Sequence, residues 1–92
     1  MAVKFYIRDT LEIPSRHLFV LAGSIVEGTV RPGMSVKVLY NKSLPLDYKI
    51  HALEFARRDG REDTCLCLRY ADDEELDFLK CLNLGDETVT LE

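Results

Sequence analysis

The sequence predicts a small all-β protein, a six-stranded antiparallel β-barrel with one short helix near its C-terminus. Three observations lead to this class. Polar and apolar residues alternate along much of the chain, glycine and proline recur at turn-like positions between residues 23 and 36, and helical spacing of apolar residues is confined to 72–82. Because short strands leave exposed edges unless their sheet closes, we expect a closed or nearly closed barrel.

Length and composition set the broad class. The 92 residues are enough for one domain, so we expect a single barrel domain over 1–92. No apolar run approaches the roughly 18 residues of a membrane span, and the first residues lack the basic and apolar blocks of a signal peptide. An odd number of cysteines, three, favours reduced thiols. We therefore expect a cytoplasmic protein that does not contact a membrane.

The first half of the chain predicts two strands and a run of turns. Residues 3–13 alternate with period two, which places their apolar residues, from Val3 to Ile13, on one face. Residues 17–25 are apolar on both faces, as in a strand that is covered twice or one that carries an outward patch. Gly23 lies inside this strand, where glycine indicates a bulge, a bend or a close backbone approach.

The remaining elements follow from the same patterns. Gly28 and the pair 32–33 predict turns, 35–41 predicts a strand, and the pair 44–45 is expected to end it. Residues 46–58 change phase near Ala52, which predicts a bulge there. The last elements expected are a hairpin turn at 59–60, a returning strand at 64–70, a helix at 72–82 and a final strand at 86–91. The predicted core consists of Val3, Phe5, Ile7, Val20, Val36, Val38, Ile50, Leu66, Leu68 and Val89.

The order of these motifs resembles the second domain of translational GTPases, the β-barrel that follows the G domain in elongation factor Tu-like proteins. The carrying segments are "GSIVEGTVRPGMSVKV" (23–38), "FYIRDTLEIPSR" (5–16), "IHALEFARR" (50–58) and "DTCLCLRYADDEELDFLK" (63–80). The sequence departs from that pattern at Ser15, where the family usually has glycine, and lacks its Arg-Gly before the final strand. The resemblance implies the same barrel fold as a stand-alone domain.

Candidate binding residues come from the resemblance and from charge. In the related barrels the corresponding strand and turn help to hold the aminoacylated 3′ end of tRNA, which places Glu54 and Arg57 in that role and Asp63 where the family often has asparagine. Arg57, Arg58 and Arg61 also form a basic cluster around the predicted hairpin turn. A glutamate can accept a hydrogen bond from a ribose hydroxyl, and an arginine can pair with a phosphate. The alternative is that these residues are ordinary solvent-facing charges of a hairpin, which are common in turns. We see no aromatic stacking platform beside them in the sequence.

Arg16 and His17 form a second, smaller basic group at another turn. If both hairpins emerge at one end of the barrel, the two groups form a single positive rim on an otherwise acidic chain of net charge −4. That acidic balance disfavours general duplex binding, because phosphate neutralisation supplies most of the affinity of duplex-binding domains.

Other chemistry finds little support in the sequence. The chain has no phosphate-binding loop, and "NKSL" (41–44) lacks the aspartate of a guanine-reading motif, so GTP binding by this chain alone is not expected. The cysteines with one histidine could supply four zinc ligands, but no second paired-cysteine motif accompanies them, and no catalytic site, metal or cofactor is expected. The acidic run 72–77 can bind a cation or a basic partner, or simply complement a helix dipole.

We therefore expect a non-catalytic binding module that contacts tRNA, ribosomal RNA or a ribosome-associated protein through Glu54, Arg57, Arg58, Arg61 and Asp63. A protein-interaction or regulatory module of another pathway that reuses the barrel is the alternative, because a fold does not define a function. A third possibility is a piece of a larger factor whose barrel packs against a neighbouring domain.

Overall fold

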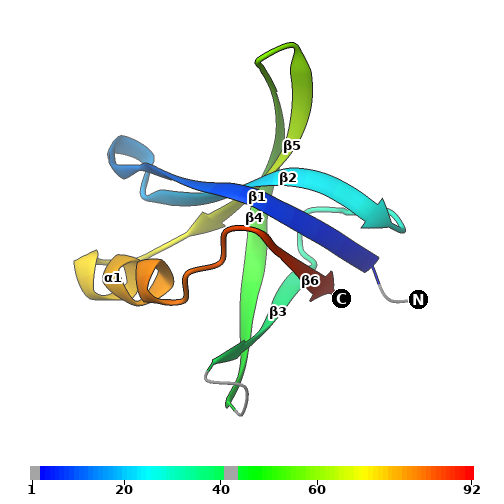
Figure 1. Cartoon of the computed structure of the whole chain (residues 1–92). Helices are drawn as coiled ribbons and strands as arrows, with labels where there is room; N and C mark the ends of the chain where they lie inside the picture. The colour runs from blue at the N-terminus through cyan, green and yellow to red at the C-terminus, as the bar shows by residue number, and fades with distance from the viewer. Residues whose placement is uncertain (1–2, 41–43) are drawn as a thin grey trace.

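Six strands form one closed antiparallel barrel in the order β1-β2-β5-β4-β3-β6 (Figure 1). The computed structural model describes residues 3–40 and 44–92, without the side chains of Tyr40 and Arg58. Of the segment 41–44, which the sequence predicts to be a loop, residues 41–43 lie outside the described residues and Leu44 begins β4. The elements are β1 (Val3–Ile13), the 3-10 turn η1 (Pro14–Arg16), β2 (Leu18–Glu27), β3 (Ser35–Tyr40), β4 (Leu44–Arg58), β5 (Arg61–Arg69), α1 (Asp73–Cys81) and β6 (Glu87–Leu91).

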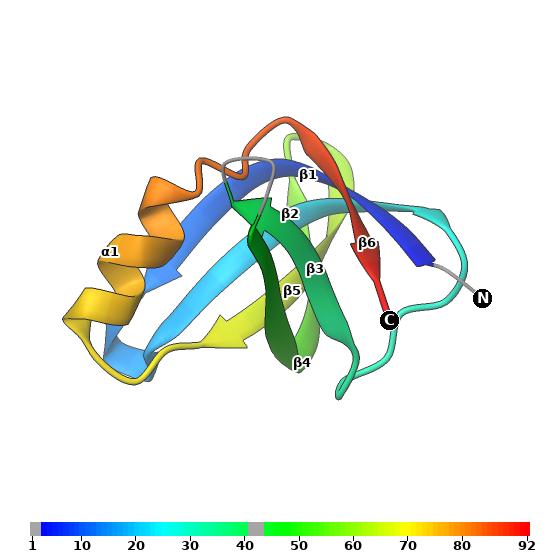
Figure 2. The ribbon, with the colours of Figure 1, turned by 90° about the horizontal axis from the view of Figure 1, so that it is seen from below.

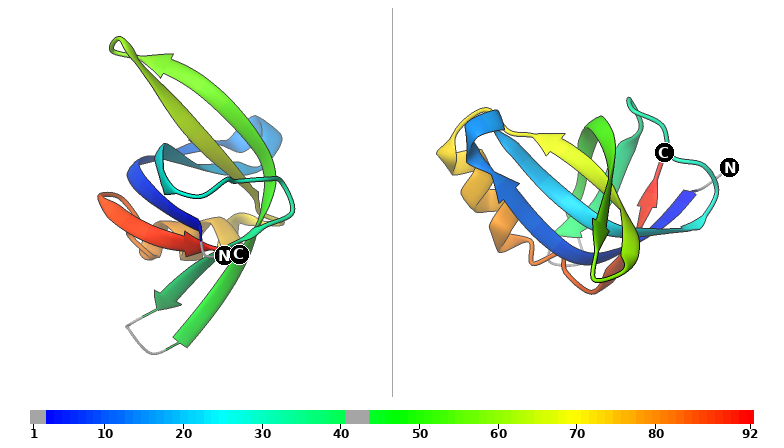
Figure 3. Two further views of the ribbon diagram at one scale, coloured as in Figure 1. Left: turned by 90° about the vertical axis from the view of Figure 1, so that its right-hand side faces the viewer. Right: turned by 90° about the horizontal axis from the view of Figure 1, so that it is seen from above.

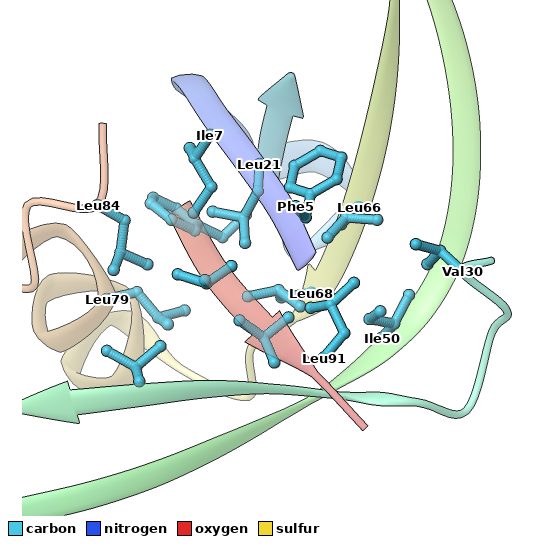
Figure 4. Packing of buried hydrophobic residues seen from close by; sticks show 14 of the residues in the cluster. Phe5, Ile7, Leu21, Val30, Ile50, Leu66, Leu68, Leu79, Leu84 and Leu91 are labelled. Carbon is cyan, nitrogen blue, oxygen red and sulfur yellow. The ribbon is translucent and has the colours of Figure 1, made fainter. Parts of the chain in front are cut away.

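The barrel interior holds the main hydrophobic core. All ten predicted core residues are buried. Nine of them belong to this core. The core also includes Leu79 of α1 and Leu84 of the segment that follows the helix. Figure 4 shows their side chains converging between the strands. The helix lies against one end of the barrel, and the start of β1 and the C-terminus lie at the other (Figure 2).

The tenth predicted core residue, Val20, belongs to a second cluster outside the barrel. There it packs with Leu18, Ala22, Cys65 and Cys67. Alternate residues of β2, Phe19 and Leu21, face the main core instead. The doubly apolar β2 is therefore a strand covered on both faces, which was one of the two alternatives that its sequence left open.

The predicted single apolar face of β1 is wrong beyond Ile7. The pairing register of β1 with β2 shifts between Ile7 and Asp9, so Arg8 is an extra, bulged residue. Before the bulge, the apolar residues of β1 point into the barrel; after it, Ile13 packs on the second cluster. The alternation of apolar residues in the sequence of β1 continues through the bulge, so the sequence does not reveal it. Apolar residues of β1 can be buried on either side of the bulge because β2 has apolar residues on both of its faces.

Gly23 makes the bulge in β1 sterically possible. It pairs with Ile7, and a Cβ atom at this position would collide with the carbonyl oxygen of Tyr6 and lie 3.1 Å from the amide nitrogen of Arg8. This glycine is the close backbone approach that its position inside a strand predicted.

The strand β4 is longer than expected, because the predicted break at Leu44–Pro45 does not occur. Pro45 lies within β4, opposite Leu39 of β3. The amide of Ile50 donates to the carbonyl of Met34 at 2.8 Å. Every second residue of β4 counted back from Ile50 therefore directs its amide toward β3, and Pro45 is not one of these residues. On the other side of β4, the ladder with β5 begins only at Ile50. Proline therefore removes no ladder hydrogen bond at this position.

The predicted bulge near Ala52 is confirmed. The register of β4 with β5 shifts between Ile50 and Ala52, which makes His51 the extra residue and returns Leu53 to the main core. The helix is also confirmed, within one residue at each end. Its N-cap Asp72 accepts a hydrogen bond from the amide of Glu75 at 2.9 Å.

Candidate nucleic-acid interface

The last part of β4 and the first part of β5, residues 54–63, form a two-stranded arm that projects from the barrel (Figures 1 and 3). The predicted turn closes it: Asp59 and Gly60 both have positive φ, 51° and 75°, between the paired residues Arg58 and Arg61. Positive φ at both central residues defines a type I′ turn, whose twist matches that of the flanking strands. The arm carries all five residues that the sequence proposed for binding.

Phe55 and Arg57 occupy one face of this arm. They lie two residues apart on β4, opposite Thr64 and Glu62 of β5. Phe55 is 65% exposed, and Arg57 is exposed and makes no ion pair with any described residue. No aromatic stacking platform was evident in the sequence beside the basic cluster, whereas the structure exposes Phe55 next to Arg57. The signal for this exposure was present in the sequence, because Phe55 continues the apolar parity of Leu53 past the end of the core.

Glu54 lies on the opposite face of β4 from Arg57, so the structure separates these two predicted partners. Glu54 borders the second cluster. Its Oε2 accepts from the Sγ of Cys67 at 3.7 Å and lies 3.5 Å from a guanidinium nitrogen of Arg16. Burial, followed by the charge of Glu54, raises the pKa of the Cys67 thiol to about 11. Glu54 thus already has partners within the fold.

Asp63 is buried, with 1% of its surface exposed, and its carboxylate pairs with the guanidinium of Arg8. The bulge in β1 presents Arg8 toward β5, across the intervening strand at its small residues Ala22 and Gly23. The Nε of Arg8 is buried without a hydrogen-bond partner among the described residues. The Arg8–Asp63 ion pair therefore links β1 to β5 across β2. The buried carboxylate of Asp63 is not available to a phosphate in solvent.

Arg58 and Arg61 complete the predicted set at the tip of the arm. Arg61 is exposed and shares the face of Asp63, opposite to that of Arg57. Arg58 pairs with it in the ladder, and its side chain lies outside the described part of the structure. Arginines therefore reach solvent from both faces of the tip.

The second basic group does not join the first. Arg16 pairs with Glu54, and the His17 ring stacks on Tyr70 with 5.5 Å between centroids and an interplanar angle of 1°. Figure 1 shows the β1–β2 turn and the tip of the β4–β5 arm pointing in different directions. The condition for one continuous positive rim is therefore not met.

The cysteines and histidines are dispersed. Cys65 and Cys67 are buried in the second cluster, Cys81 is exposed at the end of α1, and none of the three forms a disulfide. His17 follows η1, whereas His51 is the bulged residue of β4. Within residues 3–40 and 44–92, no group of three or more metal-ligating side chains gathers.

Comparison of the chain with protein-family models, curated proteins and solved structures finds no match. The resemblance to translation-factor barrels therefore stays a prediction from sequence motifs. Over the described part of the chain, no helix has the length and apolar character needed to cross a membrane.

Proposed function

We propose that the protein is a non-catalytic module that binds single-stranded RNA of the translation apparatus through its β4–β5 arm. The observation that carries the proposal is the exposed Phe55 ring on the same strand face as Arg57. Proteins that bind single-stranded nucleic acid combine an aromatic ring, on which a base stacks, with cationic groups that follow the backbone. This pair of residues provides both elements at adjacent positions on one face.

The charge distribution supports a local contact. The chain has a net charge of −4, and this acidic composition does not favour a long basic groove. Three of the seven arginines, at positions 57, 58 and 61, nevertheless lie at the tip of the arm beside the acidic residues Asp59 and Glu62, and Asp63 nearby is neutralised by Arg8. An RNA end or loop of a few nucleotides fits this arrangement better than a duplex, because duplex binding depends on many phosphate contacts.

The motif order described above connects this module to translation, and the absence of disulfides is in keeping with action in the cytosol. Under this proposal Phe55, Arg57, Arg58 and Arg61 contact RNA. Glu54 and Asp63 hold the base of the arm through their partners Arg16 and Arg8. The residues expected for binding thus divide into an RNA-facing set and a supporting set.

The test measures binding of fluorescein-labelled single-stranded RNA and of tRNA at physiological salt by fluorescence anisotropy. Loss of base stacking makes Phe55→Ala weaken binding by about 1–3 kcal/mol, roughly 5- to 150-fold. Arg57→Ala weakens binding and lowers the slope of log K against log salt by about one. The matched controls are Phe78→Ala on α1 and Arg69→Ala at the end of β5, which leave affinity unchanged. No binding by the wild-type chain, or equal losses in control and arm variants, would exclude the proposal.

A further inference from the structure

The barrel closes over a short seam between β3 and β6. Ser35 and Glu92 exchange two backbone hydrogen bonds, of 2.6 and 2.9 Å, and the ladder ends at the pair Lys37–Thr90. Beyond this pair the strands diverge, as Figure 1 shows. A groove of about 520 Å³ opens between them, bordered by residues 37–39 of β3 and 45–47 of β4 on one side and by 87–90 of β6 on the other. The described part of the barrel therefore has two strand edges that face each other without pairing.

The backbone groups in this groove are directed for strand pairing. Along an antiparallel strand, alternate residues direct both amide and carbonyl toward the same neighbour. Because Ser35 bonds to β6, Leu39 directs its amide and carbonyl toward the groove. In the same register the opposite residue is Thr88, which the ladder does not reach among the described pairs. Because β3 and β6 run antiparallel, an inserted strand pairs antiparallel with one edge and parallel with the other, and it can bond to both.

The edge of β3 has one of the usual devices against pairing, the charged residue Lys37, but Asp47 of β4 holds its ammonium group at 2.9 Å. Natural edge strands carry proline, a bulge or charged side chains, lysine above all. The open edge of β4 on the same hairpin has such a device in Pro45, whereas β3 is regular, contains no proline, and exposes 63% of Leu39. The two edges of one hairpin thus differ in the way expected if only that of β3 receives a partner.

Charge indicates the chemistry of that partner. The groove lining contains the carboxylates of Asp47, Glu87 and Glu92 against a single ammonium group, that of Lys37. Lys37 already lies 2.9 Å from Asp47 and 4.0 Å from Glu92. Glu87 is exposed and makes no ion pair with a described residue. The uncompensated negative charge favours a segment with lysine or arginine.

We propose that this groove binds an extended peptide segment as an added strand between β3 and β6, with alternating β-branched residues and a basic residue set against Glu87. Main-chain hydrogen bonds to Leu39 and Thr88 supply the attachment, and the acidic rim supplies selectivity. The groove is separate from the β4–β5 arm. The inference therefore stands or falls independently of RNA binding.

The probe is the blocked heptapeptide acetyl-Lys-Val-Thr-Val-Thr-Val-Lys-amide, titrated into the ¹⁵N-labelled full chain by NMR. The expected result is saturable shifts centred on the Leu39 and Thr88 amides, together with slower hydrogen exchange at both. Glu87→Lys weakens the interaction about fivefold because attraction becomes repulsion, and the matched Glu74→Lys on α1 leaves it unchanged. Leu39→Pro removes one donor that the β3–β4 ladder does not use and weakens binding about tenfold.

Three results would overturn the inference: no saturable binding, shifts centred elsewhere on the barrel, or equal affinity for the peptide with glutamate in place of both lysines. Concentration-dependent dimerisation that occupies the Leu39 and Thr88 amides without peptide would also overturn it, in favour of a second copy of the chain. If Leu39→Pro fails to fold, Glu87→Lys and hydrogen exchange in the wild-type chain still decide the question.

Discussion

Replacing Asp63 by alanine leaves the guanidinium of Arg8 without its carboxylate in the wall of the barrel. Breaking a buried ion pair from one side costs about 3–5 kcal/mol, because the remaining charge stays desolvated and unpaired. The Arg8 side chain is 25% exposed, so water can hydrate part of the unpaired guanidinium and reduce this cost. We therefore expect a loss of about 2–3 kcal/mol in the free energy of unfolding. For a chain of this size, that loss lowers Tm by roughly 10–20 °C.

The assay is urea and thermal unfolding followed by circular dichroism at pH 7, for Asp63→Ala, Arg8→Met and the double variant. Because the residues form one pair, the double variant loses less stability than the sum of the single losses, by about 1–3 kcal/mol. Glu62→Ala, an exposed neighbour on the same strand, serves as control and changes stability by less than about 0.5 kcal/mol. Additive effects in the cycle, or a loss below about 1 kcal/mol in Asp63→Ala, would refute the structural role of the pair.

Three further predictions concern other parts of the fold. Gly23→Ala places a methyl group against the backbone of the facing strand and lowers the unfolding free energy by about 3 kcal/mol or prevents folding, whereas Gly60→Asn at the hairpin turn costs less than about 1 kcal/mol; comparable Tm values would contradict this. Asp72→Ala removes the helix N-cap and costs about 1 kcal/mol in urea unfolding, and an unchanged midpoint would argue against the cap. Burial holds the pKa of Cys67 at about 11, so at pH 8 a thiol reagent modifies Cys81 within minutes and Cys67 only after unfolding; rapid native modification of Cys67 would show that it is accessible.

Local patterns were sufficient for most of the architecture. Period-two alternation identified the strands, the Asp59–Gly60 pair identified the turn of the arm, and the phase change before Leu53 identified the bulge of β4. These features depend on neighbouring residues along the chain, because backbone geometry sets the side-chain period and the residues that a turn tolerates. The acidic first turn and spaced leucines of α1 belong to the same class.

Tertiary structure decided how the candidate site is divided. Glu54 and Arg57 are three residues apart on one strand, so their opposite faces follow from the period of two. Only the tertiary structure shows that Glu54 contacts Cys67 and Arg16. Asp63 looked like one more charge beside the turn, but its partner Arg8 lies 55 positions away in the sequence. Such long-range pairs are invisible to periodicity, because they depend on which strands become neighbours.

The sequence by itself determined most of the strands and turns, the helix and nine of the seventeen buried residues of the main core, since each follows from local backbone preference and the burial of apolar side chains. Closure of the barrel decided the rest. It buried Asp63 beneath Arg8, left Phe55 in solvent beyond the end of the core, and ended the β3–β6 ladder at Lys37. The physical reason is that strand order, register and twist are properties of the whole sheet, and they determine which side chains meet and which edges stay open.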